Sequence, residues 1–358
     1  MKLVMQGQRP DRTPVMCQMT LGHIYKNAGI DPVEYWYTSE GAAEGFIRLA
    51  ERYKFDGILV NIGGLDPEVK HQISRVTATD NGHSVTWKDG RRTFIPPDEY
   101  PRDLDSDRTN RNISIDEFST QVIQDWAQTP VPTYYLDILN YVKERKGADL
   151  SIHGEVGTAF EILLNFLGSY ESGLIALMDD PDKCLDLMTI INQKVITLAR
   201  VQCQKGIDAL KLSSPFAGAG FISRAWYEKF VLPFEGEVIS TVHREFGIPC
   251  YIHTCGAIGD RMDLMVRTGT DGLECLDPPP LGTVDLEAAV RQIGDKVFIK
   301  GNLDSVNELT RPKNEVWKIA RERIRIGRNA KGYILSSACS ISPKVPPENI
   351  ETLHEAAR

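Results

Sequence analysis

Residues 249–256 read Pro-Cys-Tyr-Ile-His-Thr-Cys-Gly. The run from Pro249 to Cys255 is short, apolar at its centre and bounded by Pro and Gly, which is typical of a buried β-strand. The stretch before it, Ala225–Phe246, carries apolar residues at every third or fourth position, as an amphipathic helix does. A strand that follows a helix in this way indicates a fold of alternating β and α elements.

The same alternation continues on both sides of this stretch, with further amphipathic runs at Pro181–Lys205 and Val316–Ile326. Alternation of this kind implies a parallel sheet with crossover helices, and eight units favour closure into a barrel. We therefore predict an α/β fold, a (β/α)8 TIM barrel, with an open doubly wound sheet as the alternative. The eight candidate strands are Pro14–Thr20, Asp56–Ile62, Leu150–Gly154, Ala209–Ser213, Pro249–Cys255, Gly272–Leu276, Lys296–Lys300 and Tyr333–Ser337.

One segment departs from the alternation. From Val69 to Asp105 the pattern is one of short strands separated by turn signals such as Asp89-Gly90, which predicts an inserted β-meander. The strongly charged region from Asp103 to Asn112 predicts a loop. We therefore expect a single barrel domain over residues 1–358, with a β-meander and loop inserted at residues 67–112.

Composition narrows the classes of function. The chain has 358 residues, with 41 Lys+Arg and 49 Asp+Glu, and so a formal charge of −8. An acidic total without a basic block lacks the electrostatic footprint of a nucleic-acid binder. The N-terminus turns polar after Met5 and no apolar run approaches ~20 residues, so we expect neither a secretion signal nor a membrane span, and a cytoplasmic location. Seven scattered cysteines indicate free thiols or metal ligands rather than a disulfide framework.

Several predicted strands end in polar or small residues followed by Gly or Pro. In a barrel, these C-terminal strand ends share one rim, where such enzymes place their chemistry. His253 and Cys255 lie two residues apart at one strand end, so both side chains point to the same face. Cys339 follows another strand end and is the natural third ligand. A thiolate and an imidazole suit Zn²⁺, and three protein ligands leave one position for water or substrate. The alternative is a hydrogen-bonded core histidine with two buried, apolar cysteines.

Several motifs together resemble the uroporphyrinogen decarboxylase superfamily, and within it the zinc-containing methyltransferases that work with corrinoid proteins. The resemblance extends over nearly the whole chain, and the His-x-Cys with a late Cys is its most specific element. The motifs are Arg9-Pro10-Asp11-Arg12-Thr13-Pro14-Val15, Tyr251-Ile252-His253-Thr254-Cys255-Gly256, Asp271-Gly272-Leu273-Glu274, Asp277-Pro278-Pro279-Pro280, Gly301-Asn302-Leu303-Asp304, and Cys339 ahead of Pro346-Pro347-Glu348-Asn349.

This resemblance implies a (β/α)8 barrel with Zn²⁺ held by His253, Cys255 and Cys339, and a cobalamin supplied by a partner corrinoid protein. It also implies that Glu274 occupies the fourth zinc position when substrate is absent. Cys275 and water remain alternatives for that position, although adjacent strand residues face opposite ways, so only one of Glu274 and Cys275 is expected to point at the metal.

The chain also departs from the superfamily. True uroporphyrinogen decarboxylases carry an Arg-Gln-Ala-Gly-Arg segment near the first strand, which clamps the carboxylates of the tetrapyrrole, whereas this chain has Met16-Cys17-Gln18-Met19-Thr20. Decarboxylation of a polyanionic porphyrinogen is therefore disfavoured. Asp56 resembles an aspartate position of that enzyme and is a catalytic candidate, with a strand start as its structural alternative.

The resulting hypothesis is transfer of a methyl group from a small methylated molecule to the reduced corrinoid, with Zn²⁺ acting as a Lewis acid. Aromatic residues at Tyr25, Tyr35-Trp36-Tyr37, Trp126 and Tyr134-Tyr135 would suit a methoxylated ring if the early loops cover the barrel mouth, and packing is the alternative. Aryl ethers also have the better leaving groups, so O-demethylation is preferred. Methyl transfer from the corrinoid to a thiol, a metal-free lyase and a non-catalytic zinc-stabilised barrel are the competing interpretations.

Five further residues are candidates for substrate binding, each with a structural alternative. Four lie at or near predicted strand ends, and the fifth, a histidine near the first strand, is a candidate general acid for the leaving oxygen. The oligomeric state stays open, with a homodimer among the options. The five residues are Asn61, Glu155, Lys211, Asn302 and His23.

Overall fold

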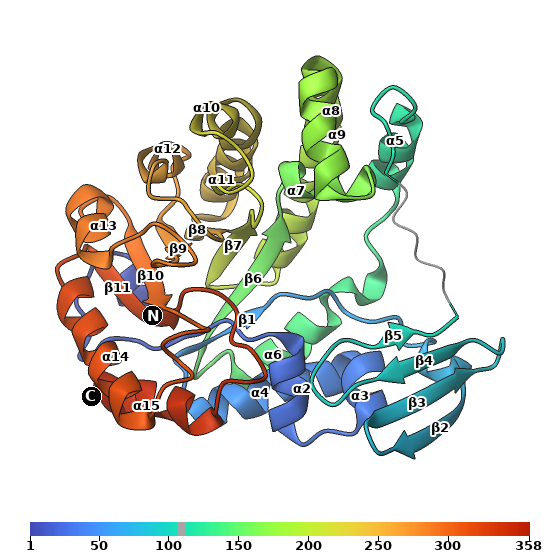
Figure 1. Ribbon diagram of the computed structural model, residues 1–358, viewed down its shortest axis with the longest axis horizontal. Coiled ribbons are helices and arrows are strands. Elements are labelled where there is room, and N and C mark those ends of the chain that lie inside the picture. Colours follow the sequence, from blue (N-terminus) through green and yellow to red (C-terminus); the bar gives the residue numbers. More distant parts are fainter. Residues whose placement is uncertain (106–111) are drawn as a thin grey trace.

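A computed structural model describes residues 1–105 and 112–358 of the chain. Its centre is a curled sheet of seven parallel strands, which lie in sequence order around the ring (Figure 1). The strands are β1 (Gly57–Val60), β6 (Ser151–Gly157), β7 (Ala209–Ser213), β8 (Cys250–Thr254), β9 (Gly272–Cys275), β10 (Phe298–Leu303) and β11 (Gly332–Ser337).

Helices fill the connections between successive strands and cover the outside of the sheet, as Figure 1 shows. The helices before β1 are α1 (Lys2–Met5), α2 (Leu21–Ala28), α3 (Pro32–Tyr37) and α4 (Ser39–Tyr53). Those from β1 to β7 are α5 (Thr120–Gln128), α6 (Asp137–Lys146), α7 (Ala159–Phe166), α8 (Tyr170–Asp179) and α9 (Pro181–Gln204). The remaining helices are α10 (Arg224–Trp226), α11 (Leu232–Phe246), α12 (Met262–Arg267), α13 (Leu286–Ile293), α14 (Lys313–Gly327) and α15 (Pro347–Ala357).

The barrel-like α/β fold predicted from the alternation is confirmed, with one correction. The first predicted strand, Pro14–Thr20, forms no regular strand; it makes two isolated parallel bridges, from Val15 to Leu335 of β11 and from Met19 to Ile341. The reason is local: the amide of Val15 donates to the Asp56 side chain (2.8 Å), and Thr20 caps α2 by accepting from His23 N. This segment still closes the ring, because Val15 O also accepts from Asp56 N, next to β1.

Local sequence explains where the elements begin and end. Helix α9 begins with Pro181 at its first position, and the Asp180 side chain accepts from Lys183 N at 3.0 Å, which satisfies a free amide of the first turn. The stretch predicted at Ala225–Phe246 is continuous from α10 through one π-helical turn (Tyr227–Val231) into α11.

The predicted β-meander is present as a separate antiparallel sheet, which lies beside α3 and away from the barrel strands (Figure 1). A short 3₁₀ turn, Lys70–Gln72, leads into it. Of the loop predicted at 103–112, residues 106–111 lie outside the described residues. The four strands are β2 (Ile73–Thr79), β3 (Gly82–Trp87), β4 (Arg92–Ile95) and β5 (Arg102–Asp103).

The inside of the barrel has an apolar floor at the amino ends of the strands. This floor is a buried cluster of side chains from β1, β7, β8, β10 and β11, joined by the segment before β1 and by α1. A separate, larger core lies between the sheet and the outer helices. No helix in the described part of the chain is long and apolar enough to cross a membrane. The floor consists of Val4, Met5, Met16, Leu59, Ala209, Tyr251, Phe298 and Ile334.

Candidate metal centre

Two of the predicted ligands come from the end of β8. His253 faces the barrel interior, and Cys255 follows the last strand residue, Thr254. The chain then turns at Gly256, whose φ of 75° suits a residue without a side chain. The amide of Gly256 donates to Asp277 Oδ2 at 2.6 Å, which ties this turn to the loop after β9.

The third predicted ligand, Cys339, lies just past β11 and meets the other two across the mouth of the barrel. Cys255 Sγ is 3.6 Å from Cys339 Sγ, and His253 Nε2 is 3.2 Å from Cys255 Sγ. The three donor atoms all lie within 4.8 Å of one another. A tetrahedral zinc site, with Zn–S bonds of about 2.3 Å and a Zn–N bond of about 2.0 Å, separates two sulfurs by about 3.8 Å and a nitrogen from a sulfur by about 3.5 Å. The three residues therefore fit Zn²⁺. Since a tetrahedral ion takes four ligands, one coordination position would remain for another ligand.

The pKa of the Cys339 thiol also suits a metal ligand. Hydrogen bonds with Cys255 and Cys275 are the main reason that the pKa of Cys339 lies far below its usual value, which favours the thiolate form. Thiolate is the form of cysteine that binds metal ions.

Glu274, in β9, does not lie on the thiol side of His253. Its Oε2 is 3.0 Å from His253 Nδ1, whereas the thiols approach Nε2 on the other side of the ring. Glu274 is held there by Lys300, which contacts Oε1, and by Lys211, whose Nζ is 3.4 Å from Oε2. Although burial opposes ionisation, Lys300 and Lys211 keep the pKa of Glu274 well below its ordinary range. The carboxylate thus orients the imidazole as an outer-shell partner of a metal-binding histidine does.

Cys275 lies on the same side as the other thiols, which differs from the alternation expected along a strand. Its φ of 82° is left-handed, so the chain twists as β9 ends. Burial and then hydrogen bonds with Cys255 and Cys339 raise the pKa of Cys275 well above its ordinary value. This neutral thiol donates to Asp277 Oδ2 at 3.2 Å.

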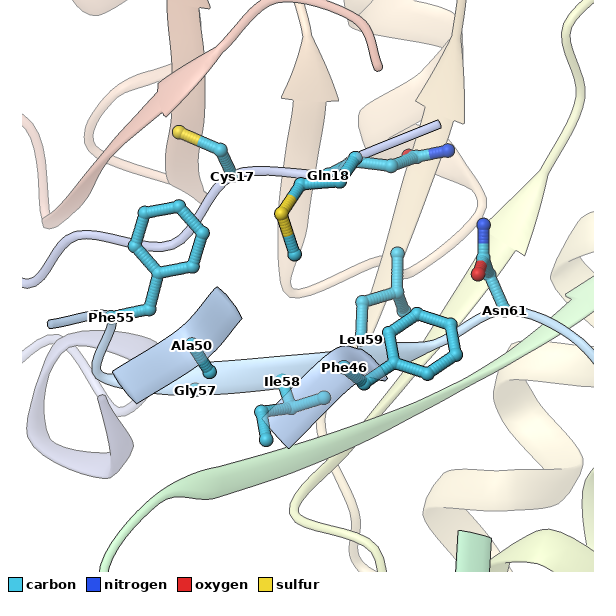
Figure 2. Close-up of a pocket in the computed structure, with 10 residues that line it drawn as sticks. Cys17, Gln18, Phe46, Ala50, Phe55, Gly57, Ile58, Leu59 and Asn61 are labelled. Carbon is cyan, nitrogen blue, oxygen red and sulfur yellow. The ribbon is translucent and has the colours of Figure 1, made fainter. Parts of the chain in front are cut away.

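Lys211 and Glu155 belong to the same polar layer of the barrel mouth. Lys211 Nζ is 3.1 Å from Glu155 Oε2, and it also donates to Gln18 Oε1. Gln18 was not predicted as a site residue, since a lone glutamine in an apolar run carries no distinctive pattern. Figure 2 shows Gln18 and Asn61 at one end of a small pocket whose other end holds Cys17 and Phe55.

Asn61 and Asn302 each present a buried amide oxygen without a hydrogen-bond partner among the described residues. Asn302, at the end of β10, donates through Nδ2 to Leu276 O at 2.9 Å. Asn61 and Glu155 line a cavity of about 200 Å³, together with Tyr135 and Gln202. Tyr135 is thus the member of the predicted aromatic group that reaches the site.

Four of the other predicted aromatic residues pack in two places that do not line this cavity. Tyr25, Tyr35 and Trp36 form a cluster in which the ring centroids of Tyr35 and Trp36 are 4.8 Å apart. Trp126 packs edge-on against Phe166.

The structure does not bring His23 and Asp56 to this site. His23, in α2, is fully buried, with Nε2 2.8 Å from Tyr53 Oη and Nδ1 3.0 Å from Ser342 O. Burial lowers the pKa of His23 to about 4, so it is neutral and its ring is engaged on both sides. Asp56 precedes β1 at the opposite end of the barrel, where it binds Arg12 at 2.6 and 2.9 Å. Both placements favour the structural alternatives.

Comparison with known proteins places the chain in a family. A family model described as uroporphyrinogen decarboxylase (URO-D) matches residues 108–358. The methylcobamide:CoM methyltransferase MtbA of Methanosarcina acetivorans is 24% identical over 225 residues, which are 62% of this chain and 62% of that protein. A uroporphyrinogen decarboxylase of Nitrosospira multiformis is 29% identical over 179 residues, 49% of this chain and 47% of the relative.

The chain therefore spans about three fifths, or less, of the length of these curated relatives. Among solved structures, a methyltransferase from Methanosarcina mazei superposes with a TM-score of 0.70 at 16% identity, over 99% of this chain and 96% of that one, which shows a shared fold. The resemblance predicted from the motifs is confirmed, and its relatives include corrinoid methyltransferases. The chain belongs to the uroporphyrinogen decarboxylase family.

Proposed function

We propose that this protein is a zinc-dependent methyltransferase that moves a methyl group from a small methylated molecule to the cob(I)alamin of a corrinoid protein. The observation that carries the proposal is the meeting of His253, Cys255 and Cys339 at the barrel mouth, at spacings that suit a tetrahedral metal with an open position. The similarity to a methylcobamide:CoM methyltransferase supports the same reaction class.

When bound, Zn²⁺ would act as a Lewis acid on the heteroatom that carries the methyl group. The residues of this chain have separate tasks. His253, Cys255 and Cys339 hold the ion, and the two thiolates balance its charge. Glu274 accepts the Nδ1 proton of His253 in a hydrogen bond, which leaves Nε2 free to bind the metal. Lys211 and Lys300 fix Glu274 in that position rather than at the open fourth site.

An aryl methyl ether is the substrate that we favour. Tyr135, Asn61 and Glu155 line the 200 Å³ cavity beside the polar layer, and this lining suits a ring with polar substituents. The segment Met16–Thr20 carries no arginine, so it offers no clamp for a polyanionic porphyrinogen. The relative MtbA, a methylcobamide:CoM methyltransferase, favours methyl transfer from the corrinoid to a thiol as the second candidate.

A corrinoid protein would dock on the rim. Three loops that follow strand ends carry partly exposed apolar side chains, namely Phe221 after β7, Leu281 after β9 and Val306 after β10, with 42%, 48% and 54% of their surface exposed. Because these loops surround the same mouth, their apolar side chains support contact with a protein partner there. The cytoplasmic location and the homodimer remain predictions from the sequence.

The test is a methyl-transfer assay with the zinc-loaded protein. We would mix it with free cob(I)alamin and a panel of methoxyarenes, methylated amines and methyl thioethers, and follow the loss of cob(I)alamin absorbance. The expected result is methylation with a methoxyarene, abolished by C339S. Methylation of a thiol from methylcobalamin alone would support the second candidate, and the absence of both reactions would exclude the proposal.

A further inference from the structure

Glu161 is a carboxyl group at the barrel mouth that the sequence analysis missed. It lies in the first turn of α7, which begins two residues after the end of β6 at Gly157. Glu161 Oε2 is 3.2 Å from the position that a Cβ on Gly157 would occupy. The carboxyl therefore folds back against Gly157, into space that a side chain at residue 157 would crowd.

The strand register shows where that space is. Gly157 pairs with Ser213 of β7, and Ser213 pairs with His253 of β8, so the three residues lie at the same height in the sheet. Two residues earlier, Glu155 pairs with Lys211, and both side chains point into the barrel. Because side chains alternate along a strand, position 157 also faces inward. The carboxyl of Glu161 thus lies inside the mouth at the level of His253, whose backbone is roughly 10 Å from that of Gly157 across two strand spacings.

Three titratable side chains lie near Glu161, one from each of three successive strands. Glu155 comes from β6, Lys211 from β7 and His253 from β8. Burial, followed by the negative charge of Glu155, raises the pKa of Glu161 to about 7, while Lys211 and His253 act in the opposite direction. Glu161 is only partly buried, so it can exchange its proton with solvent.

We propose that Glu161 is the acid that protonates the heteroatom leaving the methyl group, an inference that rests on the proposed function. The bond from the methyl carbon to the heteroatom breaks, and its electron pair stays on the heteroatom. The reduced corrinoid, as the second substrate, supplies the pair that forms the new bond to carbon. The proton passes from Glu161 to the heteroatom, and the carboxylate then regains a proton from water. In the reverse direction, the same carboxylate accepts the proton of an attacking thiol.

The first test uses two probe ethers that differ in leaving group, anisole and 4-nitroanisole, with free cob(I)alamin and zinc-loaded protein. The nitro group stabilises the departing phenolate, so this substrate has little need of an acid. We expect E161Q to lower kcat on anisole by about 10²- to 10⁴-fold and on 4-nitroanisole by less than about tenfold. Wild-type kcat on anisole should fall as the pH rises through about 7, where Glu161 loses its proton, and E161Q should lack this step.

Three further variants separate chemistry from structure. E161D should regain part of the activity and the pH step. G157A keeps every charge but places a methyl group against Glu161 Oε2, so it should shift the profile in the same direction as E161Q. E171Q removes an exposed glutamate from the first turn of α8 and should leave both substrates unaffected. Equal losses on both ethers, or an unchanged pH profile in E161Q, would overturn the assignment.

A second readout does not depend on methyl transfer. We would titrate 2-mercaptoethanol into the zinc-loaded protein by calorimetry at pH 8, in two buffers with different ionisation enthalpies. E161Q should release about one proton for each thiol bound. Wild type should release fewer, because the negative charge of the bound thiolate raises the pKa of Glu161 and its carboxylate then takes up part of the thiol proton. Equal proton release would contradict the role of Glu161. If the thiol binds with the expected proton uptake but no ether is demethylated, the proposed substrate is wrong and the proposed role of Glu161 stands.

Discussion

The floor and the mouth of the barrel are made by the same strands but differ in composition. On β8 the floor residue Tyr251 is followed two positions later by His253, and on β10 Phe298 is followed by Lys300. Both pairs face inward, because side chains alternate along a strand. A single step of two residues therefore changes a buried apolar layer into a buried charged one.

The two layers contribute in opposite ways to stability. Burial of the floor side chains stabilises the fold, whereas each buried ion of the mouth costs desolvation energy that its partners offset. In the mouth, Glu274 has two ammonium partners, Lys211 and Lys300, and Lys211 also meets Glu155. A buried layer of ions that costs desolvation energy indicates selection for function rather than for stability. The following substitutions test this difference between the mouth and the floor.

The largest effect is expected from C339S in the mouth. The substitution removes one of the two sulfurs of the metal trio and leaves a hydroxyl, which is a poor ligand for Zn²⁺. We expect the variant to retain no zinc after dialysis and to lose methyl transfer. Metal content by plasma emission spectroscopy and folding by circular dichroism check this result. Retention of one zinc per chain would show that the ion is held elsewhere.

Next comes F298A in the floor. Phe298 is 1% exposed, and its ring packs against Tyr251 with centroids 5.9 Å apart. Truncation of such a side chain costs about 3–5 kcal/mol in the free energy of unfolding. Zinc affinity should stay close to wild type in the folded protein, because the ligands lie in the other layer. Urea denaturation and zinc titration together measure both quantities, and a parallel loss of zinc affinity would mean that the layers are coupled.

A smaller effect on the metal is expected from E274Q. The substitution weakens the hydrogen bond to His253 Nδ1 and should lower zinc affinity by about 10- to 100-fold. Glu235, a buried glutamate of α11 that accepts from Ser214 and Tyr227, provides the matched control. E235Q should leave zinc affinity unchanged. If the two variants bind zinc equally well, Glu274 is not the partner that orients His253.

The smallest effect is expected from D56N at the floor end. The amide side chain of this variant would lose the ionic part of the contact with Arg12 but keep an acceptor for the Val15 amide. Since both ion-pair side chains are partly exposed, the expected loss is about 1 kcal/mol in unfolding free energy, with methyl transfer unchanged. Urea denaturation and the methyl-transfer assay measure the two quantities. A large drop in kcat would restore the catalytic role that the sequence suggested for Asp56.

Features with a local pattern could be predicted from the sequence. The apolar runs bounded by Gly and Pro located seven of the eight proposed strands, and the His-x-Cys motif with Cys339 identified three donors that the fold brings within 4.8 Å. Features that depend on tertiary contacts could not be predicted. Pro14–Thr20 has strand-like composition, but the Asp56 side chain takes the amide that a ladder would use.

The same limit applies to the missed or misplaced site residues. Glu161 is in an ordinary first-turn position, and only the register of three strands shows that it reaches the mouth. Glu274 was favoured over Cys275 as the residue that points at the metal, but it is the Cys275 thiol that hydrogen-bonds with Cys255 and Cys339, at a residue with a left-handed backbone. His23 follows the first predicted strand, Pro14–Thr20, in sequence, yet its ring lies between Tyr53 and Ser342 and not at the site.

The bridge between Val15 and Leu335 has a consequence for biosynthesis. The segment near Val15 is translated about 320 residues before its partners, since Cys17 Sγ accepts from Ser337 N and Thr20 donates to Ile341 O. At about 5–20 residues per second, a ribosome needs roughly 15 to 65 s to travel from one to the other. During that interval Cys339 has not yet been made. Capture of the ion by all three donors can therefore begin only after Cys339 has been synthesised.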